Sequence, residues 1–228
     1  PISSFKQALA QYGIIVGSHI LQINDIKEER FNPMGVSDAE LAELHTKKFA
    51  VMDDAVGEKM QERILQAKSE LNSVGGVIEA IALHLPAGIG APYFDSVESM
   101  LSHALFSVPA VKGVEFGDGF GFARLTGAEA NDALHYVDGK VKALTNHNGG
   151  VTGGITNGMP FVVRVAIKPT PSIAREQQTV SLKEQADTTL AIVGRHDPCI
   201  VQRAVPVIEA VVAWTLWDLL LEAKKWEK

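Results

Sequence analysis

The chain has 228 residues, of which 46% are hydrophobic, so it can form the buried core of one large domain or two small ones. Its formal net charge of −6 argues against nucleic acid or an anionic membrane as partner, because these are bound through massed lysines and arginines. The single cysteine, Cys199, excludes an intrachain disulfide and a cysteine-based metal cluster. Because residues 1–6 also lack a signal-peptide pattern, we expect a cytoplasmic location.

The first predicted elements are a short helix and a strand. A helical pattern covers residues 4–12 and stops at Gly13, a residue type that commonly ends helices. Residues 14–24 then read as a strand, with His19 on a mainly apolar face. A histidine in that position is expected to be hydrogen-bonded and structural rather than catalytic.

Two helices follow, the first with a clear start signal. Ser37 and Glu40 have the spacing of a capping box and predict a helix to about residue 49. An amphipathic helix begins at residue 54 or 57 and runs to a turn at residues 72–76. The further elements predicted before residue 149 are a strand over 77–85, a helix over 96–106, a strand over 111–116, a short helix over 128–136 and a polar loop over 138–148.

Residues 149–198 hold the strongest candidate for a binding site. A glycine-rich turn over 149–158 precedes a β-branched run over 161–168, which we predict to be a strand that ends at Lys168. The turn that follows contains Pro169, Thr170, Pro171 and Ser172, and its two prolines restrict the backbone. Arg195 supplies a second cation in the segment over 194–198. Fixed cations beside a close-approaching backbone predict an anion-binding site.

Each of these motifs also has a purely structural interpretation. The turn after Lys168 can be a simple strand exit, and Asp197 before Pro198 can be the cap of a helix. Because the motifs occur together, near a glycine-rich loop, the binding site is the favoured interpretation.

The chain ends in a long helical pattern over residues 199–224 that is apolar almost all round. Such a helix either spans a membrane or is buried in protein, and the charged residues inside this one favour burial. Strands and helices alternate irregularly along the chain. We therefore predict an α+β fold in which antiparallel sheets flank buried core helices, as a single domain over residues 1–228.

Several blocks follow one another in a distinctive order. They are Asn72-Ser73-Val74-Gly75-Gly76, residues 108–119, Gly153-Gly154-Ile155-Thr156-Asn157-Gly158, residues 164–172, Gly194-Arg195-His196-Asp197-Pro198-Cys199 and Arg203-Ala204-Val205-Pro206. These blocks closely resemble the chorismate synthase family, and several blocks in register are more specific than one glycine motif. The resemblance implies a β-α-β sandwich in an enzyme that is usually a homotetramer.

The resemblance also implies a lyase that removes phosphate and a ring proton from 5-enolpyruvylshikimate 3-phosphate, a small anionic substrate. The family requires reduced FMN, which is not consumed. The implied FMN-binding residues are Pro109, Ala110, Gly153, Lys168, Pro169, Thr170, Pro171, Ser172 and Arg195. Asp197 matches the family's aspartate beside the flavin, which assists deprotonation, and is the implied catalytic residue. Many members have Asn-Ala at the position of Pro109-Ala110, so a side-chain amide is lost here.

The family's long N-terminal section has no counterpart in these 228 residues. It holds a Gly-x-Ser-His-Gly motif, an arginine-rich substrate loop, a second histidine and an Arg-x-Ser-Ala-Arg-Glu-Thr motif. General acid–base groups contribute about 10²–10⁴-fold each to the rate, so a chain without the family's two histidines should be severely impaired by itself. Three hypotheses follow. The chain is a truncated or split chorismate synthase that needs an N-terminal companion chain, or a non-catalytic paralogue that binds flavin or a related anion. Alternatively, it is a structural partner that assembles through sheet edges, as a homo-oligomer (dimer or tetramer) or with a full-length enzyme.

Overall fold

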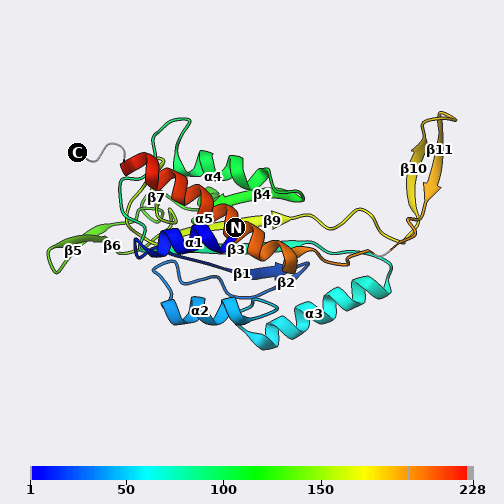
Figure 1. Ribbon diagram of the computed structural model, residues 1–228, viewed down its shortest axis with the longest axis horizontal. Helices are drawn as coiled ribbons and strands as arrows, with labels where there is room; N and C mark the ends of the chain where they lie inside the picture. The colour runs from blue at the N-terminus through cyan, green and yellow to red at the C-terminus, as the bar shows by residue number, and fades with distance from the viewer. Residues whose placement is uncertain (1, 195, 225–228) are drawn as a thin grey trace.

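A computed structural model describes residues 2–194 and 196–224. Its main unit is an antiparallel sheet of five strands in the order β2-β1-β3-β9-β4 (Figure 1). The strands are β1 (Ile15–Ile23), β2 (Ile26–Lys27), β3 (Gly76–Leu83), β4 (Val111–Phe116) and β9 (Phe161–Ile167). The three central strands are buried on both faces, which explains their nearly continuous apolar runs. The predicted α+β class with antiparallel sheets is confirmed.

Helices cover both faces of this sheet. One layer consists of α1 (Ile2–Ala10), α4 (Val97–Phe106) and α5 (Val201–Lys224), and the other of α2 (Asp38–Thr46) and α3 (Asp54–Ser69) (Figure 1). Side chains on opposite faces of the strands pack against the two helix layers. Ile78 and Val163 belong to the larger apolar cluster with α5, whereas Ile81 and Val162 pack with the α2 side chain Leu41.

Side-chain caps begin three of the helices, and the sequence predicted the first of these caps. Ser37 accepts a hydrogen bond from the Glu40 amide, and Glu40 in turn accepts one from the Ser37 amide, so the predicted capping box exists. Asp53 caps α3 by accepting from the backbone N–H groups of Ala55 and Val56. Ser96 caps α4 through the Ser99 amide.

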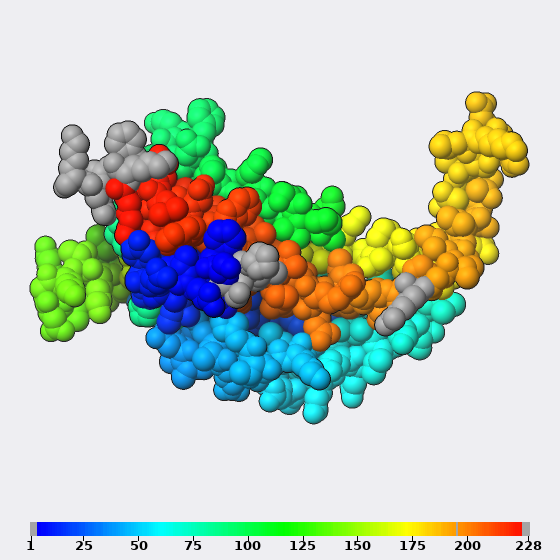
Figure 2. Space-filling model, in the orientation of Figure 1, coloured from blue at the N-terminus to red at the C-terminus, as the bar shows by residue number. Residues whose placement is uncertain are grey.

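Besides the main sheet, the described part of the chain contains three small two-stranded hairpins. They are β5 (Leu134–Val137) with β6 (Lys140–Ala143), β7 (Val151–Thr152) with β8 (Ile155–Thr156), and β10 (Gln177–Ser181) with β11 (Ala186–Leu190). The predicted short helix over 128–136 and loop over 138–148 were therefore wrong. The signal was the pair Asp138-Gly139, whose φ angles of 52° and 76° suit a two-residue hairpin turn. The hairpin of β10 and β11 projects away from the body (Figure 2).

The long helix α5 packs against α1, α4, β1 and β3. It is the one described helix that is long and apolar enough to cross a membrane by length and composition, but half of its most apolar window is buried inside the protein. Its inner face is buried, whereas Val207, Trp214 and Leu221 on the outer face are 38%, 51% and 40% exposed. The expectation that this helix is buried all round was therefore wrong for its outer face.

Candidate functional site

Lys168 and the proline-containing turn lie at the end of β9, beside the turn at residues 72–76. The backbone N–H of Lys168 donates to the carbonyl oxygen of Ala110 at 2.9 Å, which joins the turn to the start of β4. The hydroxyl of Ser73 donates to the carbonyl oxygen of Thr170 at 2.6 Å. Two segments that are almost 100 residues apart in sequence are thus fixed to each other.

Gly75 shows how closely these segments approach. A Cβ atom at this position would lie 2.3 Å from the carbonyl oxygen of Ile167 and 3.0 Å from the ring of Pro169. Any side chain here would push the turn away from β9. On the other side, the Val74 amide donates to the carbonyl oxygen of Pro198 at 2.8 Å, which adds the third segment, residues 194–198.

A cavity of about 820 Å³ opens where these segments meet. It lies between the end of α3 and the loop before α5, and its lining includes the cations Lys68 and Arg203 and the carboxylate of Asp197. Ile173 and Ala174, which directly follow the proline turn, form part of the wall. Of the predicted anion-binding segments, the described residues of 194–198 line this cavity, whereas residues 149–158 and 168–172 are not among its lining residues.

Asp197 is held at this cavity by two contacts. Its carboxylate lies 2.6 Å from a guanidinium nitrogen of Arg203 and accepts a 3.3 Å hydrogen bond from the Cys199 amide. Because α5 begins at Val201, Asp197 forms a local turn and is not the cap of that helix. The alternative interpretation of Asp197 as a helix cap is thus wrong.

Two further groups at the site have distinct states. The hydroxyl of Thr170 is buried and has no hydrogen-bond partner in the described part of the chain, which is unusual for a buried polar group. Burial raises the pKa of the Cys199 thiol to about 11, so this cysteine is protonated and unreactive at neutral pH. That state agrees with a packing role for Cys199.

The structure does not gather all the predicted site residues. Ala110 contacts Lys168 through the backbone, and Pro109 precedes it. Gly153 lies in the turn between β7 and β8, next to the start of α4, whereas Pro109 lies beyond the end of that helix. Ten helical residues separate these points by roughly 15 Å. A ligand that touches both would have to extend along α4. Arg195 lies outside the described residues, so its predicted pairing with Lys168 stays a prediction.

A second cavity, of about 1030 Å³, lies at the Gly153 end of the molecule. The hairpin of β5 and β6 lines it with Lys140 and Lys142, and His84 and Asn157 line it from other loops. Sequence reasoning did not identify this cavity. The sequence analysis also assigned no role to Lys68 or Arg203, which line the first cavity. No local sequence pattern marks Lys68 as a cavity residue.

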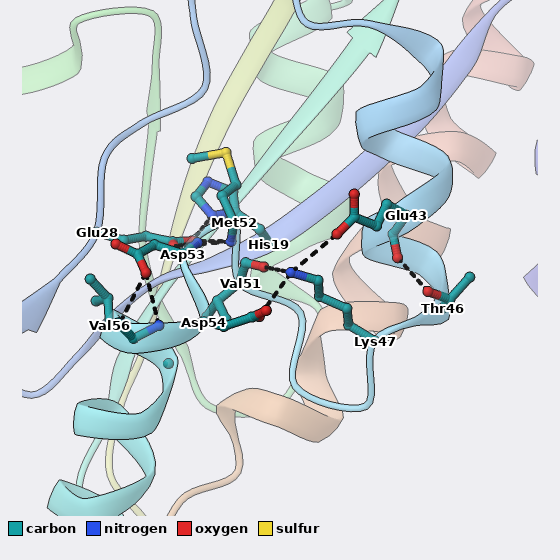
Figure 3. A network of polar contacts seen from close by, with 12 residues as sticks. His19, Glu28, Glu43, Thr46, Lys47, Val51, Met52, Asp53, Asp54 and Val56 are labelled. Carbon is teal, nitrogen blue, oxygen red and sulfur yellow. Dashed lines mark hydrogen bonds and ion pairs between the residues drawn. The ribbon is translucent and has the colours of Figure 1, made fainter.

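The opposite layer contains a buried network of ionisable side chains. His19 is completely buried, bonds Glu28 through Nδ1 and lies 3.1 Å from Glu79 through Nε2. Figure 3 shows His19 beside Glu28, whose carboxylate accepts from the amides of Met52 and Asp53 at the start of α3. The expectation of a hydrogen-bonded structural histidine is confirmed.

The network continues across the sheet at one register level. Glu79 pairs with Arg164, which also donates from Nε to Glu115 at 2.7 Å. Burial by itself lowers the pKa of His19, but the two glutamates outweigh burial and raise it. Burial raises the pKa of Glu79, yet the bonds and charges of His19 and Arg164 lower it below its usual value. Both pKa shifts therefore favour the charged forms of His19 and Glu79.

Comparison with known proteins assigns residues 3–221 to one family. The family model described as "Chorismate synthase" matches residues 3–221. The chain is 44% identical to the chorismate synthase of Thermococcus gammatolerans over 222 residues, which is 97% of this chain and 60% of that protein. It is 50% identical over 171 residues to that of Dehalococcoides mccartyi, covering 75% and 47%. A structure titled "Crystal Structure of Chorismate Synthase" superposes with a TM-score of 0.78 at 29% identity, covering 97% of this chain and 61% of that one.

Proposed function

This chain belongs to the chorismate synthase family, and we propose that it acts in the elimination of phosphate from 5-enolpyruvylshikimate 3-phosphate to give chorismate. The chain spans about 60% of the length of the first curated relatives that it matches. The proposal rests chiefly on one observation, which is that the segment around Asp197 and the residues directly after the proline turn line one cavity together with the cations Lys68 and Arg203.

The residues present at this cavity suit reduced FMN, the cofactor of the family. Lys68 and Arg203 at the cavity can neutralise a phosphate ester, and Lys168 lies on the adjoining turn. The partnerless hydroxyl of Thr170 can donate to a phosphate oxygen. When bound, the reduced flavin supplies electron density beside the departing phosphate of the substrate.

The chain's own residues have three tasks in this proposal. The side chains of Lys68, Lys168 and Arg203 bind anionic groups, and the prolines that follow Lys168 restrict the backbone beside it. Asp197, held by Arg203 and the Cys199 amide, supplies a carboxylate that accepts the proton lost from the ring. The apolar part of the wall, which includes Ile173, limits the access of water.

A binding experiment tests the cofactor role directly. We expect FMN titration, followed by flavin fluorescence, to saturate with the wild-type chain, and Lys168→Gln to weaken binding at least 10-fold because a phosphate contact is lost. Riboflavin, which lacks the phosphate, should bind the two proteins alike. Lys59→Gln is the matched control, since Lys59 is exposed on the helix α3, remote from the turn in sequence. Absence of saturable FMN binding to the wild type would contradict the proposal.

Catalysis is tested by measuring the release of phosphate from 5-enolpyruvylshikimate 3-phosphate in the presence of reduced FMN. Release by the wild-type chain supports the full reaction, and saturable FMN binding without release instead supports a flavin-binding chain that needs a companion polypeptide.

We also propose that the chain acts in the cytoplasm, because the members of its family are biosynthetic enzymes.

A further inference from the structure

The second cavity has no role in the proposed function. Its volume of about 1030 Å³ is at the upper end of the range of about 300–1,000 Å³ that is typical of small-molecule sites. It lies beside the hairpin of β5 and β6, at the end of the molecule opposite the arm formed by β10 and β11 (Figure 1). The first cavity lies instead at the base of that arm, where Ile173 and Gly194 line it. The two cavities are therefore separate.

The cations of the second cavity are not neutralised by neighbouring carboxylates. Lys140 and Lys142 of β6 line the cavity, and neither has an ion-pair partner among the described residues. Asp132 is the one acidic residue among the described lining residues. Two positive charges thus lie at this cavity, although the whole chain has a formal net charge of −6. A local positive field of this kind favours an anionic ligand.

The carboxylate of Asp132 is already occupied by internal hydrogen bonds. Its Oδ1 accepts from the Thr145 hydroxyl and from the His147 amide, each at 2.8 Å. Its Oδ2 accepts from the backbone amide and the side-chain amide of Asn148, at 3.0 and 2.8 Å. Asp132 therefore fixes the loop before β7 and is not a free partner for the two lysines.

A buried imidazole nitrogen beside Lys142 lacks a hydrogen-bond partner. His135 pairs with Lys142 across the hairpin, so their side chains lie on the same face of it. His135 and Val137 are half-buried, whereas Tyr136 between them is 78% exposed, so the face with His135 turns toward the body. The Nδ1 atom of His135 is buried and forms no hydrogen bond with any described residue. Such an atom needs an explanation, and a bound group supplies one.

Much of the remaining wall is apolar. It includes Met34, Val36, Leu83, Val141, Met159 and Pro160. An inorganic anion would leave this apolar surface in contact with water, and a neutral apolar ligand would leave the two lysines without a counter-charge. The ligand that matches the whole cavity therefore combines an apolar body with a negative charge.

From these observations we propose that the second cavity binds a small organic anion that has an apolar body and one carboxylate, sulfonate or phosphate group. The Cα atoms of Lys140 and Lys142, two residues apart on one strand, are separated by about 7 Å, so both ammonium groups can reach one anionic group between them. The Nδ1 atom of His135 can donate to the same group. The apolar body then covers the wall that contains Val141 and Met159.

The test uses anilinonaphthalene sulfonate, a fluorescent probe whose apolar rings carry one sulfonate. We expect its fluorescence to saturate with the wild-type chain and Lys142→Gln to weaken binding about fivefold or more, because a charge contact is lost. Phenylnaphthylamine, which has the same rings without the sulfonate, should bind the two proteins alike. Lys183→Gln is the matched control, since Lys183 is exposed in the turn between β10 and β11, and it should bind the probe like the wild type.

A second variant shows whether the probe lies inside the cavity. Ala87 is exposed and lines the cavity, so Ala87→Trp fills part of it without removing a charge or changing the core. This variant should weaken the binding of both compounds. Far-UV circular dichroism should be unchanged in all three variants, because positions 87, 142 and 183 are exposed.

Several results would overturn the proposal. They are a wild type without saturable binding of anilinonaphthalene sulfonate, equal effects of Lys142→Gln and Lys183→Gln, and full binding to Ala87→Trp. Loss of probe binding in Lys168→Gln would also overturn it, since the probe would then occupy the proposed FMN site. A chain that binds the probe as expected but binds no FMN would contradict the proposed function alone.

Discussion

Asp197 is the residue on which the proposed chemistry depends most. Its carboxylate has a cation at 2.6 Å and a backbone donor at 3.3 Å, so its position at the cavity is fixed by contacts within the segment and the first turn of α5. A fixed carboxylate reduces the reorganisation that a proton transfer would otherwise need.

Asp197→Asn is expected to lower phosphate release by about 10²–10⁴-fold, because the amide cannot accept the proton. The affinity for FMN should change little, since the side chain keeps its size and the cationic groups remain. Steady-state rates and flavin titrations of the same preparation measure both effects. Asp218→Asn, an exposed change on α5, serves as the control. Parallel loss of binding and turnover would indicate damage to the fold instead.

At the scale of elements, the buried side chain of Glu209 links its own helix, α5, to three other elements. Glu209 of α5 bonds Lys6 of α1, accepts from the Ser18 hydroxyl of β1 at 2.7 Å and lies 2.9 Å from the imidazole of His45 of α2. Burial raises the pKa of Glu209, but these partners outweigh burial and lower it below its usual value. The buried carboxylate of Glu209 on α5 is thus paired with other side chains.

Glu209→Ala is expected to lower the free energy of unfolding by about 1–3 kcal/mol. The change leaves the Ser18 hydroxyl and the partly buried Lys6 without their acceptor, and each unsatisfied group carries a desolvation cost. Urea unfolding at constant pH measures the effect. Asp218→Ala on the exposed side of the same helix should change stability by less than about 0.5 kcal/mol. Equal effects of the two changes would show that helix propensity, not the buried contacts, is responsible.

At the scale of the whole molecule, buried ionisable groups make stability depend on pH. His19 has a folded-state pKa above its ordinary value of 6.5, so its contribution is complete below pH 6.5 and is lost as pH rises through the raised value. Glu79 and Glu209 have folded-state pKa values below 4.5, so their contributions are complete above pH 4.5 and are lost on further acidification. The protein should be most stable between these limits.

His19→Gln should therefore cost most stability near pH 5–6, and its difference from the wild type should shrink as pH rises toward 9. Urea unfolding at a series of pH values measures this difference. His103→Gln, at an exposed position of α4, is the control and should follow the wild type throughout. A pH-independent difference for His19→Gln would mean that lost packing, rather than lost charge, explains its effect.

Much of the architecture could be predicted from the sequence by itself. Capping residues such as Ser37 and Ser96 act within one turn of a helix, and β-branched runs such as residues 161–167 favour strands, so local patterns determined these elements. The blocks around Lys168 and Asp197 identified the family. The hairpin at Asp138-Gly139 was missed although its turn residues are also a local signal.

Only the tertiary structure decided how distant segments meet. The cavity depends on the approach of Gly75 to Ile167, the row of His19, Glu79 and Arg164 depends on strand register, and the exposure of β10 depends on the arm leaving the body. These relations join residues that are tens of positions apart. Because the free energy of such contacts arises only when the strands pair and the helices pack, no local pattern along the chain contains it.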